Sequence, residues 1–300
     1  MNFESARSFI YRNARPLDLA RWRYLFEGGD RALVLTALAA YQNPDGGFGH
    51  GLEADCWNPE SSPVQTWAAT QILRELGLDG GEHPIVQDIL RYLASGAAFD
   101  GHFWLGTLPS NDAHPHAPWW NYDPEQAWGY NPTASLIGFI LRCAGRESPL
   151  YALAARLAEE AYAWFRAHVP LESMHTAACF VELYEDLRAC APEGVELDEF
   201  EALLHAQLQH VLTRDPDVWA REYVCKPSLF IRNRESPFYG ENRALCELEC
   251  EFIAETQEAD GSFRVTWDWG GYPEQWAVAK NWWKSDLILK NARFCRAMEG

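Results

Sequence analysis

The sequence predicts an all-α protein arranged as one α/α toroid. Apolar residues recur at three- and four-residue spacing along most of the chain, which is typical of amphipathic helices. No alternating apolar and polar run bounded by turn residues suggests a sheet. Similar Asp-Gly-x-Phe turns follow several of the expected helices, as in a repeat array. With 48% hydrophobic and 14% aromatic residues, the 300-residue chain can bury a sizeable core.

The periodic segments divide into two kinds. The expected helices span residues 3–14, 32–42, 63–77, 84–96, 132–145, 150–169, 174–190, 197–213, 241–257 and 281–298. Helices that precede the turns carry more charge, as at Arg156, Glu159 and Glu160, and we expect them to form an outer layer. Helices that follow the turns open on small hydroxyl residues, such as Thr66 and Thr133. Small residues let helix ends crowd together, so these helices are expected to form an inner layer.

The turns between the layers repeat. Gln42–Phe48 reads QNPDGGF, Gln257–Phe263 reads QEADGSF, and a shorter copy, FDGHF, spans Phe99–Phe103. In each copy the Asp can accept bonds from turn amides, the Gly permits a positive φ, and the Phe can pack under the preceding helix. Roughly five to six inner and outer helix pairs, closed into a ring, would leave no exposed end. We therefore expect residues 1–300 to form a single toroidal domain.

Composition excludes several classes of partner. The chain has 43 acidic and 25 basic residues, and its net charge of −18 repels nucleic acids and anionic membranes. No stretch approaches the ~20 apolar residues of a membrane helix, and the N-terminus lacks the apolar run of a signal peptide. The 8 cysteines form no C-x-x-C pair, so we expect reduced thiols in a cytoplasmic protein. The expected partner is a small-molecule substrate, or another protein.

The turn QNPDGGFG, the loop after it and the helix that opens at Thr66 resemble the repeats of the protein prenyltransferase β-subunit and squalene cyclase superfamily. The resemblance extends to residues 257–263, is weaker at 100–103 and is undetectable between about 150 and 230. It implies an α/α toroid whose cavity mouth is lined by loops that lead into the inner helices. Neither diagnostic motif of the superfamily is complete. Residues 215–218 lack the last Asp of D-x-D-D, and the D-x-C zinc motif does not occur.

The loop Gly49–Glu60 carries the candidate catalytic residues, Glu53 and Asp55. In an extended loop, residues two apart point the same way, so the two carboxylates could face one ligand. Paired carboxylates in unequal surroundings can act as acid and base. His50 and Trp57 are candidate substrate contacts in the same loop. Alternatively, both acids cap helices or bond loop amides, as loop acids usually do.

Residues 100–131 form a long loop rich in His and Trp. Loops of about 30 residues without regular structure tend to be functional. Aromatic rings can bind sugar C–H faces or cations and can shelter carbocations; alternatively, they pack as core at the end of the toroid. His114 and His116 could share a zinc ion with a third ligand such as His102, although loop histidines more often face solvent. The candidate substrate-binding residues are Trp104, Trp119, Trp120, Tyr122 and Trp128.

A third aromatic cluster, Trp267-Asp268-Trp269, follows the second clear Asp-Gly-x-Phe turn. Corresponding loops of a toroid meet at one rim, so we expect this cluster to face the loops of Glu53 and Trp119. His175 opens an expected inner helix and is predicted to point toward the same cavity.

These features favour a toroid with an acidic, aromatic pocket that binds or transforms a small apolar or isoprenoid substrate. Glu53 or Asp55 would then donate a proton or stabilise a carbocation. A carbohydrate-active enzyme is the first alternative, because glycosidases on α/α toroids also combine Trp with paired carboxylates. A non-catalytic scaffold that binds a ligand or a protein is the second alternative.

Overall fold

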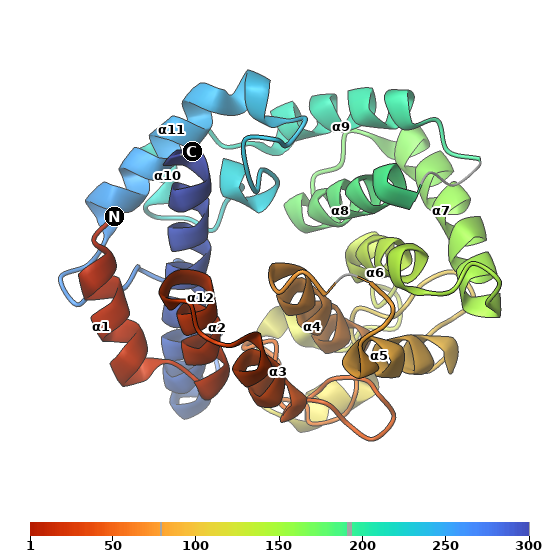
Figure 1. Ribbon diagram of the computed structural model, residues 1–300, viewed down its shortest axis with the longest axis horizontal. Coiled ribbons are helices and arrows are strands. Elements are labelled where there is room, and N and C mark those ends of the chain that lie inside the picture. The colour runs from red at the N-terminus through yellow and green to blue at the C-terminus, as the bar shows by residue number, and fades with distance from the viewer. Residues whose placement is uncertain (79, 191–193, 300) are drawn as a thin grey trace. The chain divides into compact units, whose positions relative to one another are not determined.

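The computed structural model describes residues 1–78, 80–190 and 194–299 (Figure 1). The predicted all-α class is confirmed: 62% of the structure is helical, and the described residues form isolated β-bridges but no strand. The chain forms two compact units: Met1–Ala40 with Leu212–Gly300 is unit 1, and Tyr41–Val211 is unit 2. Within the described ranges, no helix combines the length and apolar character needed to cross a membrane.

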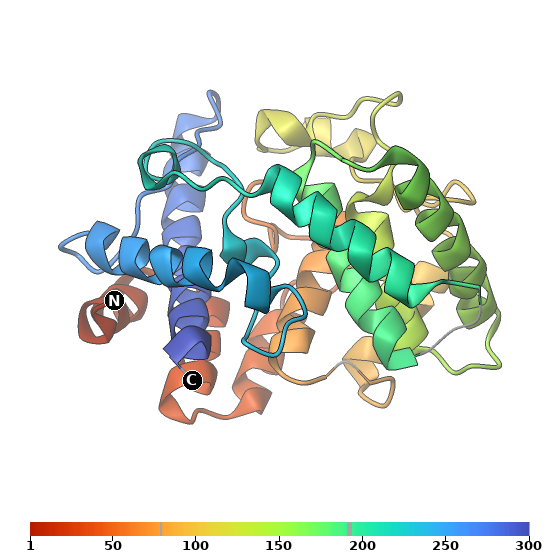
Figure 2. The same ribbon diagram turned by 90° about the horizontal axis from the view of Figure 1, so that it is seen from above.

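Unit 2 is built around the packed pair α6 (Tyr130–Cys143) and α8 (Met174–Cys190) (Figure 2). α7 packs against α6, α9 packs against α8, and both α4 and α5 contact α6. The sequence predicts all of these helices to within a few residues at each end. The bounds of the surrounding helices are α4 Pro63–Glu75, α5 Pro84–Ala94, α7 Pro149–His168 and α9 Leu197–Val211.

Three helices of unit 2 share one start signal. α4, α5 and α7 each have Pro in the first helical turn, where its missing N–H costs nothing. The residue before each Pro is Ser62, His83 or Ser148, and its side chain accepts a hydrogen bond from a first-turn amide. These caps fix where each helix begins.

Unit 1 is centred on α12, which packs against α1, α2 and α11. Its start at Pro273 precedes the expected start at residue 281. No pattern in the sequence predicted α2. The helix bounds are α1 Phe3–Asn13, α2 Pro16–Glu27, α3 Arg31–Ala39, α10 Pro216–Trp219, α11 Tyr239–Thr256 and α12 Pro273–Glu299.

The sequence pattern does not predict α2 because its buried face includes charged residues. Asp18 is fully buried, and its carboxylate accepts hydrogen bonds from Arg15 Nε at 2.8 Å and Arg21 Nη1 at 3.1 Å. Arg21 also donates to Asp286 of α12 at 3.1 Å. Buried charges are normally paired in this way. The ion pairs replace apolar residues on the inward face, so the apolar periodicity of α2 is weak.

The turn Gln42–Phe48, called here the first joint, has the geometry expected from its sequence. The Asp45 carboxylate accepts a hydrogen bond from the Gly47 N–H at 3.0 Å. Gly46 has φ 96°, and the Phe48 side chain is fully buried. The predicted roles of Asp and Gly in this turn are confirmed, and the packing of Phe48 under the preceding helix stays a prediction.

The turn Gln257–Phe263, the second joint, repeats these features. The Asp260 carboxylate accepts from the Ser262 N–H at 2.9 Å, Gly261 has φ 92°, and Phe263 is buried. In both joints the side-chain amide of the first Gln donates to the carbonyl of this glycine, at 3.1 Å in the first joint and 3.0 Å in the second. The two turns therefore share one local structure.

Each joint glycine lies directly against a helix. A Cβ on Gly46 would lie 2.1 Å from the Asp88 carbonyl oxygen of α5, and one on Gly261 would lie 2.1 Å from the Ser5 carbonyl oxygen of α1. Gly101, in the short third copy, has φ 107° but no atom within 4 Å of its Cβ position. Only the two full joints thus require glycine for close approach as well as for φ.

Small hydroxyl residues connect the turns to the helices that follow them. Thr66 Oγ1 accepts a hydrogen bond from the Phe48 N–H at 3.1 Å, and Thr133 Oγ1 accepts from the Trp104 N–H at 3.0 Å. The hydroxyl residues therefore satisfy backbone donors as well as allowing close packing.

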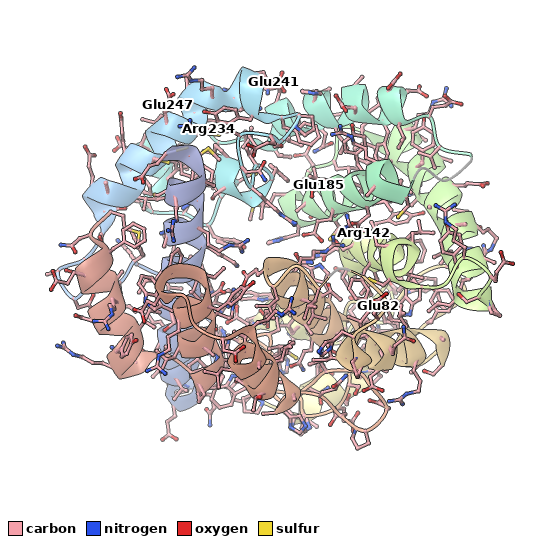
Figure 3. The ribbon with its side chains drawn as sticks, in the orientation of Figure 1. Glu82, Arg142, Glu185, Arg234, Glu241 and Glu247 are labelled. Atoms are coloured by element: carbon pink, nitrogen blue, oxygen red, sulfur yellow. The ribbon has the colours of Figure 1, made fainter. Side chains whose placement is uncertain are left out.

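A buried ion pair joins α4 to α8 inside unit 2. The Arg74 guanidinium donates two hydrogen bonds to the fully buried Asp186 carboxylate, at 2.8 and 2.5 Å. Arg142 of α6, labelled in Figure 3, lies 3.6 Å from the same carboxylate. Burial lowers the pKa of Arg74, but the facing carboxylate outweighs this effect and raises the pKa overall. Gly138 of α6 leaves the space that Asp186 occupies, because a Cβ there would lie 2.4 Å from Asp186 Oδ2.

The joint glycines provide a first prediction. Gly101→Ala should cost about 1–2 kcal/mol of unfolding free energy from backbone strain alone. Gly46→Ala and Gly261→Ala should cost about 1–3 kcal/mol more, because the methyl group must displace a helix backbone. Urea unfolding of the three variants measures the difference. Equal losses at all three positions would contradict the role assigned to close approach.

The buried ion pair provides a second prediction. Asp186→Leu and Arg74→Met should each cost about 3–5 kcal/mol of unfolding free energy, since each removes one partner of a buried ion pair. The double variant should lose far less than the sum of the two. A double-mutant cycle by urea unfolding measures the coupling. Additive losses would show that the two side chains do not depend on each other.

Candidate functional site

The loop Gly49–Glu60 folds as a series of turns, not as extended chain. His50 and Gly51 have φ 59° and 73°, and these successive positive values turn the chain immediately after the first joint. The Asn58 carbonyl accepts hydrogen bonds from the His50 N–H at 2.9 Å and from Gln65 Nε2 of α4 at 2.8 Å. The alternating side-chain directions expected of an extended loop therefore do not apply.

The two candidate catalytic acids differ in burial. Asp55 is 3% exposed and Glu53 is half-buried. Glu53 Oε2 accepts a hydrogen bond from the Asp55 backbone N–H at 2.8 Å, so this carboxylate also supports the loop. Burial raises the pKa of neighbouring Cys56 to about 12, and both carboxylates add to the rise. The thiol is therefore protonated near neutral pH and is not a nucleophile.

This first loop pairs with a second loop, residues 109–129, which ends where α6 begins. Asp55 O accepts from the Ala117 N–H at 2.8 Å, and the Trp57 N–H donates to the carbonyl of residue 115 at 3.0 Å. A side-chain bond also joins the two loops, in which Asn58 Nδ2 donates to Asn111 Oδ1 at 2.9 Å. We call residues 49–60 and 109–129 the loop pair. Neither asparagine was predicted from the sequence, and no spacing pattern identifies them.

Histidines of the second loop support its shape. The ring nitrogens of buried His116 lie 2.6 Å from the His114 carbonyl and 2.7 Å from Asn121 Oδ1. His102 pairs instead with Glu160 of α7 at 2.9 Å. Within residues 1–78, 80–190 and 194–299, no group of three or more His, Cys, Asp or Glu side chains could hold a metal ion. The zinc hypothesis therefore has no site among these residues.

The loop aromatics differ in accessibility. Trp119 and Trp128 are 47% and 56% exposed, whereas Trp104 is fully buried against Phe99, with ring centroids 4.6 Å apart. Trp104 thus has a packing role. The Trp120 indole N–H is buried and has no hydrogen-bond acceptor in the described part of the chain. The half-buried rings are those of Trp57, Trp120 and Tyr122.

The third predicted cluster lies in unit 1. Trp267 is half-buried and packs edge-to-face on Tyr223 and Trp283, with ring centroids 5.0 and 5.2 Å away. The exposed Asp268 accepts a hydrogen bond from the amide two residues later, at 2.7 Å. Trp269 is 1% exposed and belongs to the core. Of the three, Trp267 and Asp268 retain accessible surface.

A contact between an indole and a carboxylate was not predicted from the sequence. On α4 and α8, the Glu182 carboxylate accepts from Gln71 Nε2 at 3.0 Å and lies 3.5 Å from the Trp67 indole nitrogen. Trp67 and Gln71 lie four residues apart and therefore share one helix face. This spacing could have identified the two residues from the sequence. The predicted His175 is exposed in the first turn of the same α8.

The loop pair combines groups suited to a polyhydroxylated ligand. Exposed indole faces stack on apolar C–H surfaces, and carboxylates accept hydrogen bonds from hydroxyl groups. Comparisons with known proteins add no identity to this chemistry: no protein-family model, curated protein or solved structure matches the chain.

Proposed function

We propose that the chain closes into the α/α toroid that its sequence predicts. The first joint follows α3 and lies against α5, the next outer helix of such a ring. The second joint follows α11 and lies against α1, with Gln257 exchanging two hydrogen bonds with Asn2, at 2.6 and 3.1 Å. α1 thus takes the place that a further outer helix after α12 would take. This equivalence supports ring closure by the N-terminal helix.

We propose that the loop pair binds a carbohydrate. The observation that carries this proposal is the exposure of Trp119 and Trp128, at 47% and 56%, on a loop tied to the one that holds Glu53 and Asp55. Open indole faces on a loop hydrogen-bonded to one that carries two acids suit a ligand with alternating C–H and hydroxyl surfaces. A long apolar chain would instead need enclosure away from water.

In the same proposal, Glu53 and Asp55 form an acid–base pair for glycosidic bond cleavage. The different burial of the two carboxyl groups supports a division of roles, because unequal surroundings separate proton affinities. Glu53 is the more accessible and is assigned to the proton transfer that reaches the substrate.

An isoprenoid substrate is the second candidate. It is supported by the two joints, whose sequence resembles the prenyltransferase and squalene cyclase repeats and whose hydrogen bonds are alike. An isoprenoid alcohol tested beside the sugars separates the two candidates.

A third prediction concerns binding. Trp119→Ala and Trp128→Ala should each weaken oligosaccharide affinity about tenfold, roughly 1.4 kcal/mol, because each removes one stacking face. Titration calorimetry with neutral cello-, xylo-, malto- and chito-oligosaccharides measures this change. Leu33→Ala removes a 54% exposed apolar side chain of α3 and serves as the control. Unaltered affinity in both Trp variants, or binding of farnesol but of no sugar, would contradict the carbohydrate assignment.

A fourth prediction concerns turnover. Glu53→Gln keeps the acceptor for the Asp55 amide but removes the proton, so hydrolysis of the bound sugar should fall by about 10²-fold or more. Affinity should be retained. Glu60→Gln, which changes an exposed acid of the same loop, should have no effect. Wild-type turnover in Glu53→Gln would show that Glu53 takes no part in the chemistry, and the loop pair would then be a binding site only.

A further inference from the structure

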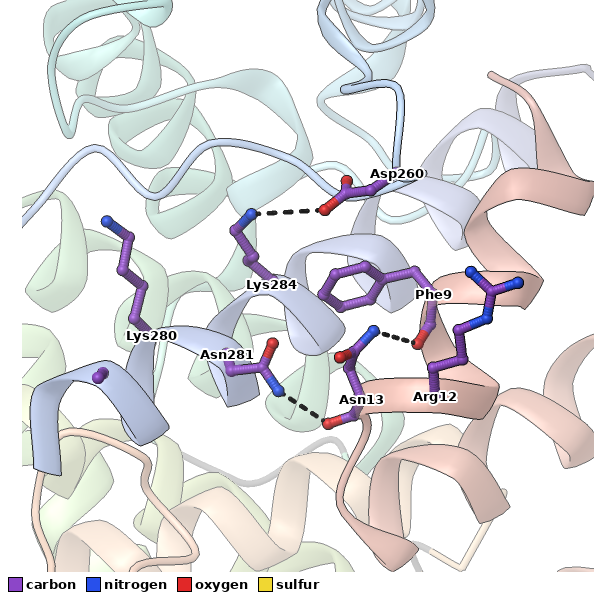
Figure 4. A pocket seen from close by; sticks show the side chains of 8 residues that line it. Phe9, Arg12, Asn13, Asp260, Lys280, Asn281 and Lys284 are labelled. Atoms are coloured by element: carbon purple, nitrogen blue, oxygen red, sulfur yellow. Dashed lines mark hydrogen bonds and ion pairs between the residues drawn. The ribbon is translucent and has the colours of Figure 1, made fainter. Parts of the chain in front are cut away.

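A pocket of about 400 Å³ opens in unit 1 between α1 and α12 (Figure 4). This volume lies within the range of about 300–1,000 Å³ that is usual for small-molecule sites. None of its residues belongs to the loop pair, so it is independent of the site proposed above. It is lined by Phe9, Arg12, Asn13, Asp260, Ala277, Lys280, Asn281 and Lys284.

Two of the three cations in the pocket are not neutralised. Lys284 Nζ lies 3.2 Å from the Glu258 carboxylate and 3.9 Å from that of Asp260. Arg12 and Lys280 form no ion pair with a carboxylate of the described residues, and Lys280 instead lies 5.9 Å from the Trp276 ring centroid. In a protein of net charge −18, unpaired cations at one pocket favour an anionic ligand.

Two amides add acceptors beside these cations. Asn13 Nδ2 donates to the Phe9 carbonyl at 3.0 Å, and Asn281 Nδ2 donates to the Asn13 carbonyl at 2.9 Å (Figure 4). These bonds engage the NH₂ groups and leave both Oδ1 atoms to accept. An amide oxygen accepts from hydroxyl groups but repels an anion. The pocket therefore suits a ligand that carries both an anion and hydroxyl groups.

We propose that this pocket binds a sugar acid or a sugar phosphate. The anionic group pairs with Lys280, and Arg12 on the opposite side of the pocket donates to the ligand hydroxyls (Figure 4). The ligand hydroxyls in turn donate to Asn13 and Asn281, and the Phe9 ring forms an apolar wall for the carbon skeleton. Carboxylate and phosphate share this chemistry, because both are oxyanions that accept charge-assisted hydrogen bonds.

Calorimetric titration of the full chain with glucuronate, glucose 6-phosphate, glucose and inorganic phosphate tests the proposal. At least one of the two anionic sugars should bind, and the tighter one identifies the anionic group. Glucose and inorganic phosphate should each bind about tenfold more weakly or not at all, because glucose lacks the anionic group and inorganic phosphate lacks the sugar hydroxyls and carbon skeleton. Raising the salt concentration should weaken the binding of the anionic sugar, because both cations are exposed.

Variants locate the site. Arg12→Gln and Lys280→Gln should each weaken binding of the anionic sugar about tenfold, and Lys280→Arg should retain it. Arg7→Gln removes an exposed arginine of the same helix that does not line this pocket, and should have no effect. Both altered positions are exposed, so folding should be preserved.

Four results would overturn the proposal. They are binding of neither anionic sugar, glucose binding as tightly as the anionic sugars, inorganic phosphate binding as tightly as glucose 6-phosphate, and equal losses in Arg7→Gln and Lys280→Gln. The last would indicate adsorption to any cation of α1 or α12. None of these results bears on oligosaccharide binding by the loop pair, so the two proposals fail separately.

Discussion

The close approach of each joint glycine to a helix carbonyl is the constraint on which the local architecture depends. At Gly46 and Gly261 the backbone comes so near α5 and α1 that no side chain fits. The Asp of each joint holds the turn by accepting a backbone N–H, and the buried Phe ends it. This geometry fixes where the chain leaves the joint. It therefore fixes where the variable loop after each joint begins.

Fold and site differ in how far the sequence predicts them. Apolar periodicity predicts most helices, and the Asp-Gly-x-Phe sequence predicts the joints. Apolar periodicity does not predict α2, because the ion-paired residues Asp18 and Arg21 lie on its buried face. The direction of Glu53 was also unpredictable, since positive φ values at His50 and Gly51 replace the extended chain that alternation requires. Local patterns identify elements, but contacts between loops decide what each loop residue faces.

The same limit explains which candidate residues changed role. Trp104 and Trp269 lie in aromatic-rich loops, as Trp119 does, yet they are buried whereas Trp119 is 47% exposed. The contact of Trp67 with Glu182 joins residues far apart in sequence, so only the packing of α4 and α8 reveals it. The pocket between α1 and α12 likewise combines residues from both ends of the chain. The proposed sites therefore rest on exposed groups and their neighbours, not on motifs.

The most direct test of the proposed carbohydrate site is the behaviour of the tryptophan indole N–H resonances. A ¹H–¹⁵N spectrum of the 14 tryptophans, assigned by single substitutions, would be followed during titration with an oligosaccharide that binds. The proposed site predicts shifts at Trp119 and Trp128, whose rings are 47% and 56% exposed and would stack on the sugar. Shifts confined to Trp267 and Trp283, or none at the loop pair, would contradict it.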